Sequence, residues 1–164
     1  MILIIDFGSQ VTQLIARRVR ELNVYCEIIP WDGDILKTIS LIKANAIILS
    51  GGPDSTRIKQ SPTISKKVFE LNIPVLGICY GHQLICKILG GKISKAKKRE
   101  FGKTKILEVI KSQSPLLKNL FKKNLEEVWM SHGDAVTELP KGFLELARSD
   151  TSPFSIVGDN TRKI

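Results

Sequence analysis

The sequence has few residues that could hold it together by covalent bonds or through a metal. Its three cysteines, Cys26, Cys79 and Cys86, include no CxxC pair, so we expect neither a disulfide framework nor a metal site. It also shows no basic leader, and its apolar start meets Asp6 long before the roughly 20 apolar residues of a membrane span. These absences predict a protein of the reducing cytoplasm with no membrane partner.

Aromatic residues are also scarce, at 6% of the chain, although the formal net charge is +9. The positive charge concentrates in the basic region 92–123, where Phe101 and Phe121 are the only aromatic rings. Single-strand nucleic-acid platforms need several stacking surfaces, so no nucleic-acid partner is expected. A solvated lysine face is the favoured interpretation, and a docking surface for a protein partner is the alternative.

Strand and helix patterns alternate along most of the 164 residues, and 43% hydrophobic composition is enough for one packed domain. Apolar runs predict strands at 1–6, 24–29, 46–50 and 74–78, and helical spacing predicts a helix over 11–22 and a short one within 31–44. Ser61, Pro62 and Asn72 suggest a helix over 61–72. Shorter strands at 103–110, 126–131 and 143–148 and a small helix near 115–121 follow. The predicted class is α/β, a mostly parallel sheet with helices on both faces and a short antiparallel extension.

The fourth predicted strand runs directly into "GICYGHQLICKILGG", which places Cys79 between Gly77 and Gly81 at a turn from strand to helix. This is the form of a nucleophile elbow, in which the tight turn projects the nucleophile from the sheet. The positive end of the following helix should lower the pKa of the thiol. Cys79 is therefore predicted to be a nucleophile for acyl chemistry, whereas Cys26 and Cys86 are predicted core residues.

The stretch "AIILSGGPDS" carries a glycine pair, Gly51 and Gly52, at the end of the third strand. Carboxyl ends of parallel strands share one edge of a sheet, so this pair should lie beside the elbow. The amides of Gly51, Gly52 and Tyr80 are then candidates for an oxyanion site. The alternative is the SGGxDS phosphate loop of ATP pyrophosphatases, but Pro53 removes a donor and no long helix follows at once.

Five segments together resemble a known family. "IDFGSQ", "ILSGGPDS", "GICYGHQ", "REFG" and "VWMSHGD" occur in the order and approximate spacing of the glutamine amidotransferase domain of GMP synthases, a class I (triad) amidotransferase. The resemblance covers nearly the whole chain and implies a flavodoxin-like core. His82 departs mildly, because this branch more often has methionine at that position.

The resemblance implies a glutaminase that supplies ammonia for the conversion of XMP to GMP. Cys79 would attack the side-chain amide of glutamine and form a glutamyl thioester. Gly52 and Tyr80 would supply the oxyanion amides. The residues implied to hold the glutamine backbone are Gln83, Ser131, His132 and Asp134, the last three in the loop 131–134. Asp134 would meet the substrate ammonium, although a turn former beside Gly133 is the alternative.

The same resemblance implies a histidine base followed by proline and glutamate near the end of the domain. No such segment occurs, and the only two histidines are His82 and His132, neither of which matches that base. We therefore expect residues 1–164 to be an incomplete amidotransferase domain without ATP pyrophosphatase or dimerisation domains, and with no cofactor, since ATP and Mg²⁺ would act in the synthetase. Three alternatives stay open: a fragment inactive alone, one chain of a split enzyme with a separate synthetase chain, and a noncatalytic glutamine-binding or regulatory domain.

Overall fold

The computed structural model describes residues 1–109, 114–118, 120–121 and 124–164, with the backbone alone over 97–100. Four parallel strands form its first sheet in the order β2-β1-β3-β4. Their bounds are Ile2–Asp6 (β1), Cys26–Pro30 (β2), Ala46–Leu49 (β3) and Val75–Gly77 (β4). The central strands β1 and β3 read as continuous apolar runs because helices cover both of their faces. The predicted α/β class is thereby confirmed.

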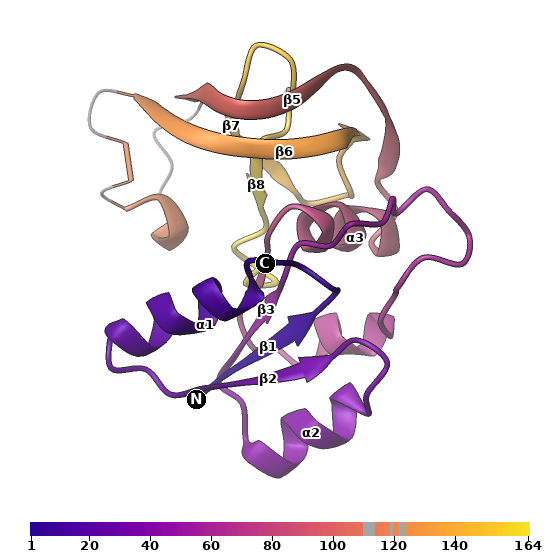
Figure 1. Cartoon of the computed structure of the whole chain (residues 1–164), viewed down its shortest axis with the longest axis vertical. Helices are drawn as coiled ribbons and strands as arrows, with labels where there is room; N and C mark the ends of the chain where they lie inside the picture. The colour runs from indigo at the N-terminus through magenta and orange to yellow at the C-terminus, as the bar shows by residue number, and fades with distance from the viewer. Residues whose placement is uncertain (110–113, 119, 122–123) are drawn as a thin grey trace.

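Helices cover the two faces of this sheet unequally (Figure 1). Helix α1 (Thr12–Glu21) packs Ala16 against Ile4 and Ile48 on one face. The opposite face, with Leu3 and Leu49, is covered by α2 (Ile35–Ile42), α3 (Tyr80–Ile88) and a 3₁₀ turn, η1 (Lys66–Glu70). The larger core therefore lies on the side of α3, the helix that follows Cys79.

The helix predicted over 61–72 is wrong in both length and type. Only η1 forms there, and it begins after Ser65, whose Oγ accepts a hydrogen bond from the Lys67 amide at 3.3 Å. The carbonyl of Pro62, which would have accepted one of the first helical hydrogen bonds, accepts instead from the Tyr80 hydroxyl. A long-range contact thus replaces the local one, although the turn still ends before Asn72, which has φ 55°.

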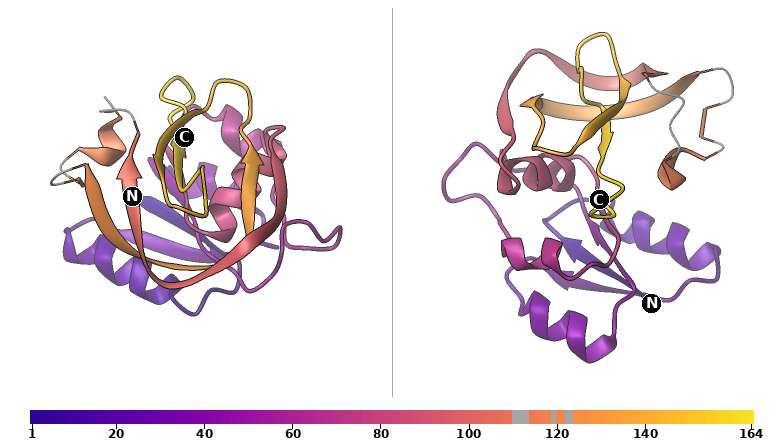
Figure 2. Two further views of the ribbon diagram at one scale, coloured as in Figure 1. Left: turned by 90° about the horizontal axis from the view of Figure 1, so that it is seen from above. Right: turned by 180° about the vertical axis from the view of Figure 1, so that it is seen from behind.

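The antiparallel part is a second four-stranded sheet, with order β6-β5-β7-β8, rather than a short extension (Figure 2). Its strands are Lys92–Glu108 (β5), Leu125–Glu138 (β6), Leu144–Arg148 (β7) and Ile156–Gly158 (β8). Strands β5 and β6 are much longer than predicted, and β8 was not predicted. The small helix near 115–121 is one 3₁₀ turn, η2 (Pro115–Leu117), and residue 119 lies outside the described residues.

Residues 131–134, expected in a loop, lie inside strand β6. His132 pairs with Glu100 and Asp134 pairs with Lys95, so two steps along β6 correspond to five along β5. The extra residues of β5 form a bulge opposite Gly133. A serine, histidine, glycine and aspartate in series are typical of turns, but here the long ladder between β5 and β6 keeps the segment extended.

Most basic residues of the region 92–123 lie within strand β5. Lys103 and Lys105 are both exposed and alternate with half-buried or buried neighbours, as expected for one solvated face of a strand. Lys103 pairs with Glu127 at 2.9 Å. Lys111 and Lys122 of the predicted patch lie outside the described residues. Among the described residues, no helix combines the length and apolar character that crossing a bilayer requires.

Candidate active site

Cys79 lies at the turn between β4 and α3, as the elbow pattern predicts. Its backbone has φ 50° and ψ −106°, a conformation that residues with a side chain rarely adopt. The turn brings α3 very close to β3: a Cβ built on Gly81 would lie 2.4 Å from the carbonyl oxygen of Leu49. Glycine is therefore required at 81 by close backbone packing, and this packing holds Cys79 in its strained position.

The environment of the thiol differs from the prediction. Cys79 is exposed as a residue, yet the surrounding walls remove water from the thiol, and this desolvation raises its pKa. The prediction that the helix end lowers this pKa is wrong in sign. Cys26 and Cys86 are buried, as predicted, and burial raises the pKa of Cys86 to about 12. The accessible thiol among the three is thus Cys79, and it needs a proton acceptor to become a thiolate.

The glycine pair lies beside the elbow. A Cβ built on Gly51 would come 3.6 Å from the Cβ of Cys79, and one on Gly52 would come 2.7 Å from the carbonyl oxygen of Phe7. Gly52 therefore permits the close approach of two backbone segments next to the thiol. Ser50 fixes the start of the loop, because its Oγ accepts from the Phe7 amide at 3.0 Å and donates to the Gly51 carbonyl at 2.7 Å.

Tyr80 anchors the other side of the elbow. Its ring lies 5.2 Å from that of Phe7, and its hydroxyl donates to the Pro62 carbonyl. Burial, with a smaller contribution from the carboxylate of Asp54, raises the pKa of Tyr80 to about 12, so the hydroxyl remains a donor. Within the described part of the chain, we find no protein acceptor for the amides of Gly52 and Tyr80. Both amides therefore remain available as hydrogen-bond donors.

The phosphate-loop alternative finds less support. No helix begins between Ser50 and Lys66, so the glycine pair does not face a helix N-terminus. The chain instead continues through turns that reach across to the second sheet.

The predicted site residues line one cavity of about 330 Å³. Both sheets contribute to its wall. All seven of these residues line it: Gly52, Cys79, Tyr80, Gln83, Ser131, His132 and Asp134. A second cavity, of about 970 Å³ and mainly apolar, extends along β4 and adjoins the first at Cys79. Cys79 therefore faces a small polar cavity and a large apolar one, and the polar one has the groups that suit a small charged substrate.

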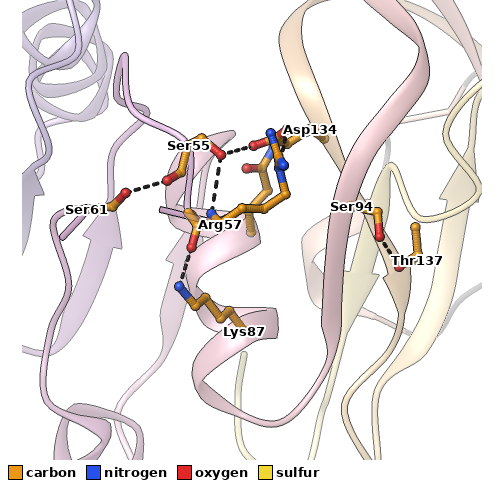
Figure 3. A network of polar contacts seen from close by, with 9 residues as sticks. Ser55, Arg57, Ser61, Lys87, Ser94, Asp134 and Thr137 are labelled. Carbon is orange, nitrogen blue, oxygen red and sulfur yellow. Dashed lines mark hydrogen bonds and ion pairs between the residues drawn. The ribbon is translucent and has the colours of Figure 1, made fainter. Parts of the chain in front are cut away.

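Two residues that the sequence did not single out hold Asp134 in place (Figure 3). Its Oδ1 accepts a hydrogen bond from Nε of Arg57 at 2.8 Å, and its Oδ2 accepts one from the Oγ of Ser55. These partners lie 77 and 79 residues away along the chain. No local pattern could have predicted the pair, because Arg57 occupies an irregular loop without periodicity.

Gln83 and His82 follow Cys79 on α3, and their side chains lie in different environments. Gln83 is buried, and its Nε2 donates to the backbone carbonyl of Asp134 at 3.0 Å, so it links α3 to β6. His82 is half-buried with a fully covered Nε2, which has no hydrogen-bond partner among the described residues. Burial, with the nearby His132 adding to it, lowers the pKa of His82 to about 4. His82 is therefore neutral at pH 7.

Comparison with known proteins agrees with this geometry. The family model described as glutamine amidotransferase class-I matches residues 3–164. The GMP synthase (glutamine-hydrolyzing) of Phenylobacterium zucineum is 52% identical over 163 residues, and that of Finegoldia magna is 47% identical over 167. These alignments cover 99% and 100% of this chain but 31% of each relative, so the chain spans about a third of their length.

Among solved structures, this chain is also similar to a candidate GMP synthase subunit and to a glutamine amidotransferase. A Thermoplasma acidophilum protein whose name describes a candidate GMP synthase subunit superposes with a TM-score of 0.82 and 30% identity, covering 99% of this chain and 79% of that one. A glutamine amidotransferase from Thermotoga maritima superposes with a TM-score of 0.74, covering 96% of this chain and 70% of that one. The latter is 20% identical, so that likeness concerns the fold alone.

Proposed function

This chain belongs to the class I glutamine amidotransferases, and from that premise we propose that it binds glutamine and is the glutaminase part of a GMP synthase. The observation that carries the proposal is the elbow itself. Cys79 is held in a strained turn and lines one polar cavity together with Gly52, Tyr80 and Asp134. The residues that we propose as nucleophile, oxyanion donors and ammonium receptor thus line one cavity.

In the proposed reaction the Sγ of Cys79 attacks the side-chain amide carbon of glutamine, and the carbonyl oxygen becomes an oxyanion near the two free amides. The thiol proton passes through a base to the leaving nitrogen, which departs as ammonia and leaves a glutamyl thioester. Water then attacks the thioester and releases glutamate and the thiol. Because its pKa is raised, the thiol depends on a base for the first step.

We propose that this base comes from polypeptide outside residues 1–164. His82 is a poor candidate, because a pKa of about 4 makes it a weak proton acceptor and its Nε2 is covered. His132 lies on β6, in the segment that we propose holds the glutamine backbone. Under this proposal the 164 residues alone bind glutamine and release little ammonia.

The ammonia would serve the conversion of XMP to GMP in a synthetase that uses ATP and Mg²⁺, with no cofactor in the amidotransferase step and with the cytoplasm as the setting. The relatives that include this region are about three times as long, and the Thermoplasma relative is named as one subunit of its enzyme. Both arrangements, one long chain and a separate synthetase chain, fit the proposal.

A noncatalytic glutamine-binding or regulatory role is the second candidate. The observation that favours it is that the Cys79 thiol keeps its proton, because its pKa is raised. His82, three residues away, has a pKa of about 4 and is a poor acceptor for that proton. A pocket of this kind can hold glutamine without hydrolysing it.

The test is intact-protein mass spectrometry after treatment with a chloroketone derived from glutamine, paired with an assay for ammonia release. We expect labelling at Cys79 well before Cys26 and Cys86, blocked by free glutamine. Equal labelling of all three thiols would remove the elbow assignment. Ammonia released by residues 1–164 alone would show a base among them, whereas release only after adding a synthetase chain would favour the split enzyme over the noncatalytic role.

A further inference from the structure

The ion pair between Arg57 and Asp134 joins the loop after β3 to strand β6 at the wall of the polar cavity. The side chain of Asp134 is only 10% exposed, whereas that of Arg57 is 42% exposed. The Arg57 backbone is also fixed, because its amide donates to Ser55 Oγ at 3.3 Å, and the same Oγ contacts Asp134. Figure 3 shows Ser55 and Arg57 converging on the one carboxylate. The arginine is thus held at both its backbone and its side chain.

Only the Nε of Arg57 contacts Asp134. Within the described part of the chain, its two terminal amino groups have no hydrogen-bond or ion-pair partner. A guanidinium binds a carboxylate best through two parallel hydrogen bonds. Arg57 therefore offers an open fork to the cavity that Cys79 also lines, and the fork is oriented before any ligand arrives.

The pair places a cationic and an anionic group side by side, with 2.8 Å between Nε and Oδ1. A free α-amino acid carries an ammonium and a carboxylate on one carbon, which is the complementary arrangement. Lys95 is a second cation at the cavity, opposite Asp134 on β5. A lysine is a flexible point charge, however, whereas Arg57 is already positioned.

We propose that Arg57 binds the α-carboxylate of the substrate while Asp134 receives the ammonium, so that the pair selects free α-amino acids. This inference rests on the proposed function and adds to it a specificity residue for the backbone end of glutamine. The reacting amide lies at the other end of the ligand, next to Cys79. Arg57 should therefore govern affinity and leave the chemistry at the thiol unchanged.

The experiment measures glutamine binding by titration calorimetry to the full chain with Cys79→Ala, which prevents turnover. Arg57→Gln added to this background should raise the Kd for glutamine by about ten- to a hundredfold, the range for hydrogen bonds to charged groups. Arg57→Lys should recover part of the affinity. The matched control is Arg17→Gln, which removes an equivalent charge from the exposed pair with Glu21 on α1 and should change the Kd less than twofold.

A second ligand separates recognition of the α-carboxylate from a general loss of structure. This ligand is an analogue of glutamine in which hydrogen replaces the α-carboxylate. The protein with Arg57 should bind glutamine at least about tenfold more tightly than the analogue, and Arg57→Gln should bring the ratio close to one. A merely structural role for Arg57 would weaken both ligands equally and keep the ratio, which would overturn the proposal.

Failure of this inference and failure of the proposed function give different results. If Arg57→Gln binds glutamine as tightly as its parent, or more tightly, Arg57 is not the carboxylate receptor, but the amidotransferase proposal stands. If the parent with Arg57 binds no glutamine at millimolar concentration, both proposals are wrong.

Discussion

The two sheets contribute to the site through contacts of very different range. Around the parallel sheet, the groups that surround Cys79 are local or belong to adjacent strand ends: the elbow glycines, the Tyr80 amide and the glycine pair that follows β3. The antiparallel sheet contributes Asp134, whose partners Gln83, Arg57 and Ser55 lie 51, 77 and 79 residues away. The strained position of Cys79 is thus made by a local turn, whereas the surroundings of Asp134 are made by tertiary packing.

This difference indicates which part of the candidate site is held rigid by the backbone. The elbow cannot relax without separating α3 from β3, because their backbones touch at Gly81. The Asp134 end depends on side-chain hydrogen bonds that can rearrange one by one. We therefore expect substitutions at the elbow to damage folding and those at the Asp134 end to affect ligands more than folding.

The largest loss of stability should come from Gly81→Ala. Alanine normally favours a helix, but here its Cβ would meet the Leu49 carbonyl oxygen at 2.4 Å, so α3 must move away from β3. We expect a loss of about 3 kcal/mol or more in the free energy of unfolding, measured by urea denaturation.

Gly102→Ala, in β5, is the matched control from the other sheet. Among the described residues, no atom beyond its chain neighbours lies within 4 Å of its Cβ position, and the cost is confined to a φ of +107°. We expect a loss of about 1 to 2 kcal/mol. Equal losses at the two glycines would mean that the parallel half is no more rigid than the antiparallel half.

An intermediate effect, dependent on pH, should come from His82. In the folded chain its pKa is about 4, whereas in the unfolded chain it is near the ordinary 6.5. As the pH falls from 6.5 to 4, the unfolded state takes up a proton that the folded state refuses, so stability falls. The loss attributable to this residue is about 3 kcal/mol. It should be absent above pH 7, develop between pH 6.5 and pH 4, and be complete below pH 4.

His82→Met tests this assignment, because it replaces the imidazole by an apolar side chain that cannot titrate. Thermal unfolding at pH 7 and pH 4.5 should show a smaller fall in Tm for the variant than for the parent. Carboxylates titrate in the same range in both proteins, so only the difference between the two falls counts. An unchanged fall would place the acid sensitivity in the carboxylates of either sheet.

The smallest effect on folding should come from Gln83→Ala, which cuts a link between the two halves. It removes the hydrogen bond from Nε2 to the Asp134 carbonyl. We expect a loss of about 1 to 2 kcal/mol in urea denaturation, with a larger proportional loss of glutamine affinity because Gln83 lines the polar cavity and anchors the β6 backbone beside it. A loss of stability alone would show that the Asp134 end is as rigid as the elbow.

Much of the parallel half could be predicted from its sequence. Strands β1 to β4, helices α1 and α2 and the turn at Cys79 follow from apolar runs, helical spacing and glycine placement, all of which are local. The segment 61–72 is the exception, since the hydroxyl of Tyr80 takes the Pro62 carbonyl. A buried partner from elsewhere in the chain outweighed a good local capping signal.

The antiparallel half was predicted less well for the same reason. The segment 131–134 has the composition of a turn, and its extension into β6 depends on a bulge in a distant strand. The seven predicted site residues do meet at one cavity, but Ser55 and Arg57 could not be anticipated. Charge partners of this kind are visible only once the two sheets are placed together.

The backbone of Cys79 has a consequence for how this protein can evolve. A φ of 50° costs a residue with a side chain about 1 to 3 kcal/mol, and glycine would avoid most of that cost. The most stable sequence for this turn is therefore one that has lost its thiol. In a population selected only for heat resistance, position 79 should drift to glycine early, and retention of cysteine there would be the mark of continuing selection for chemistry.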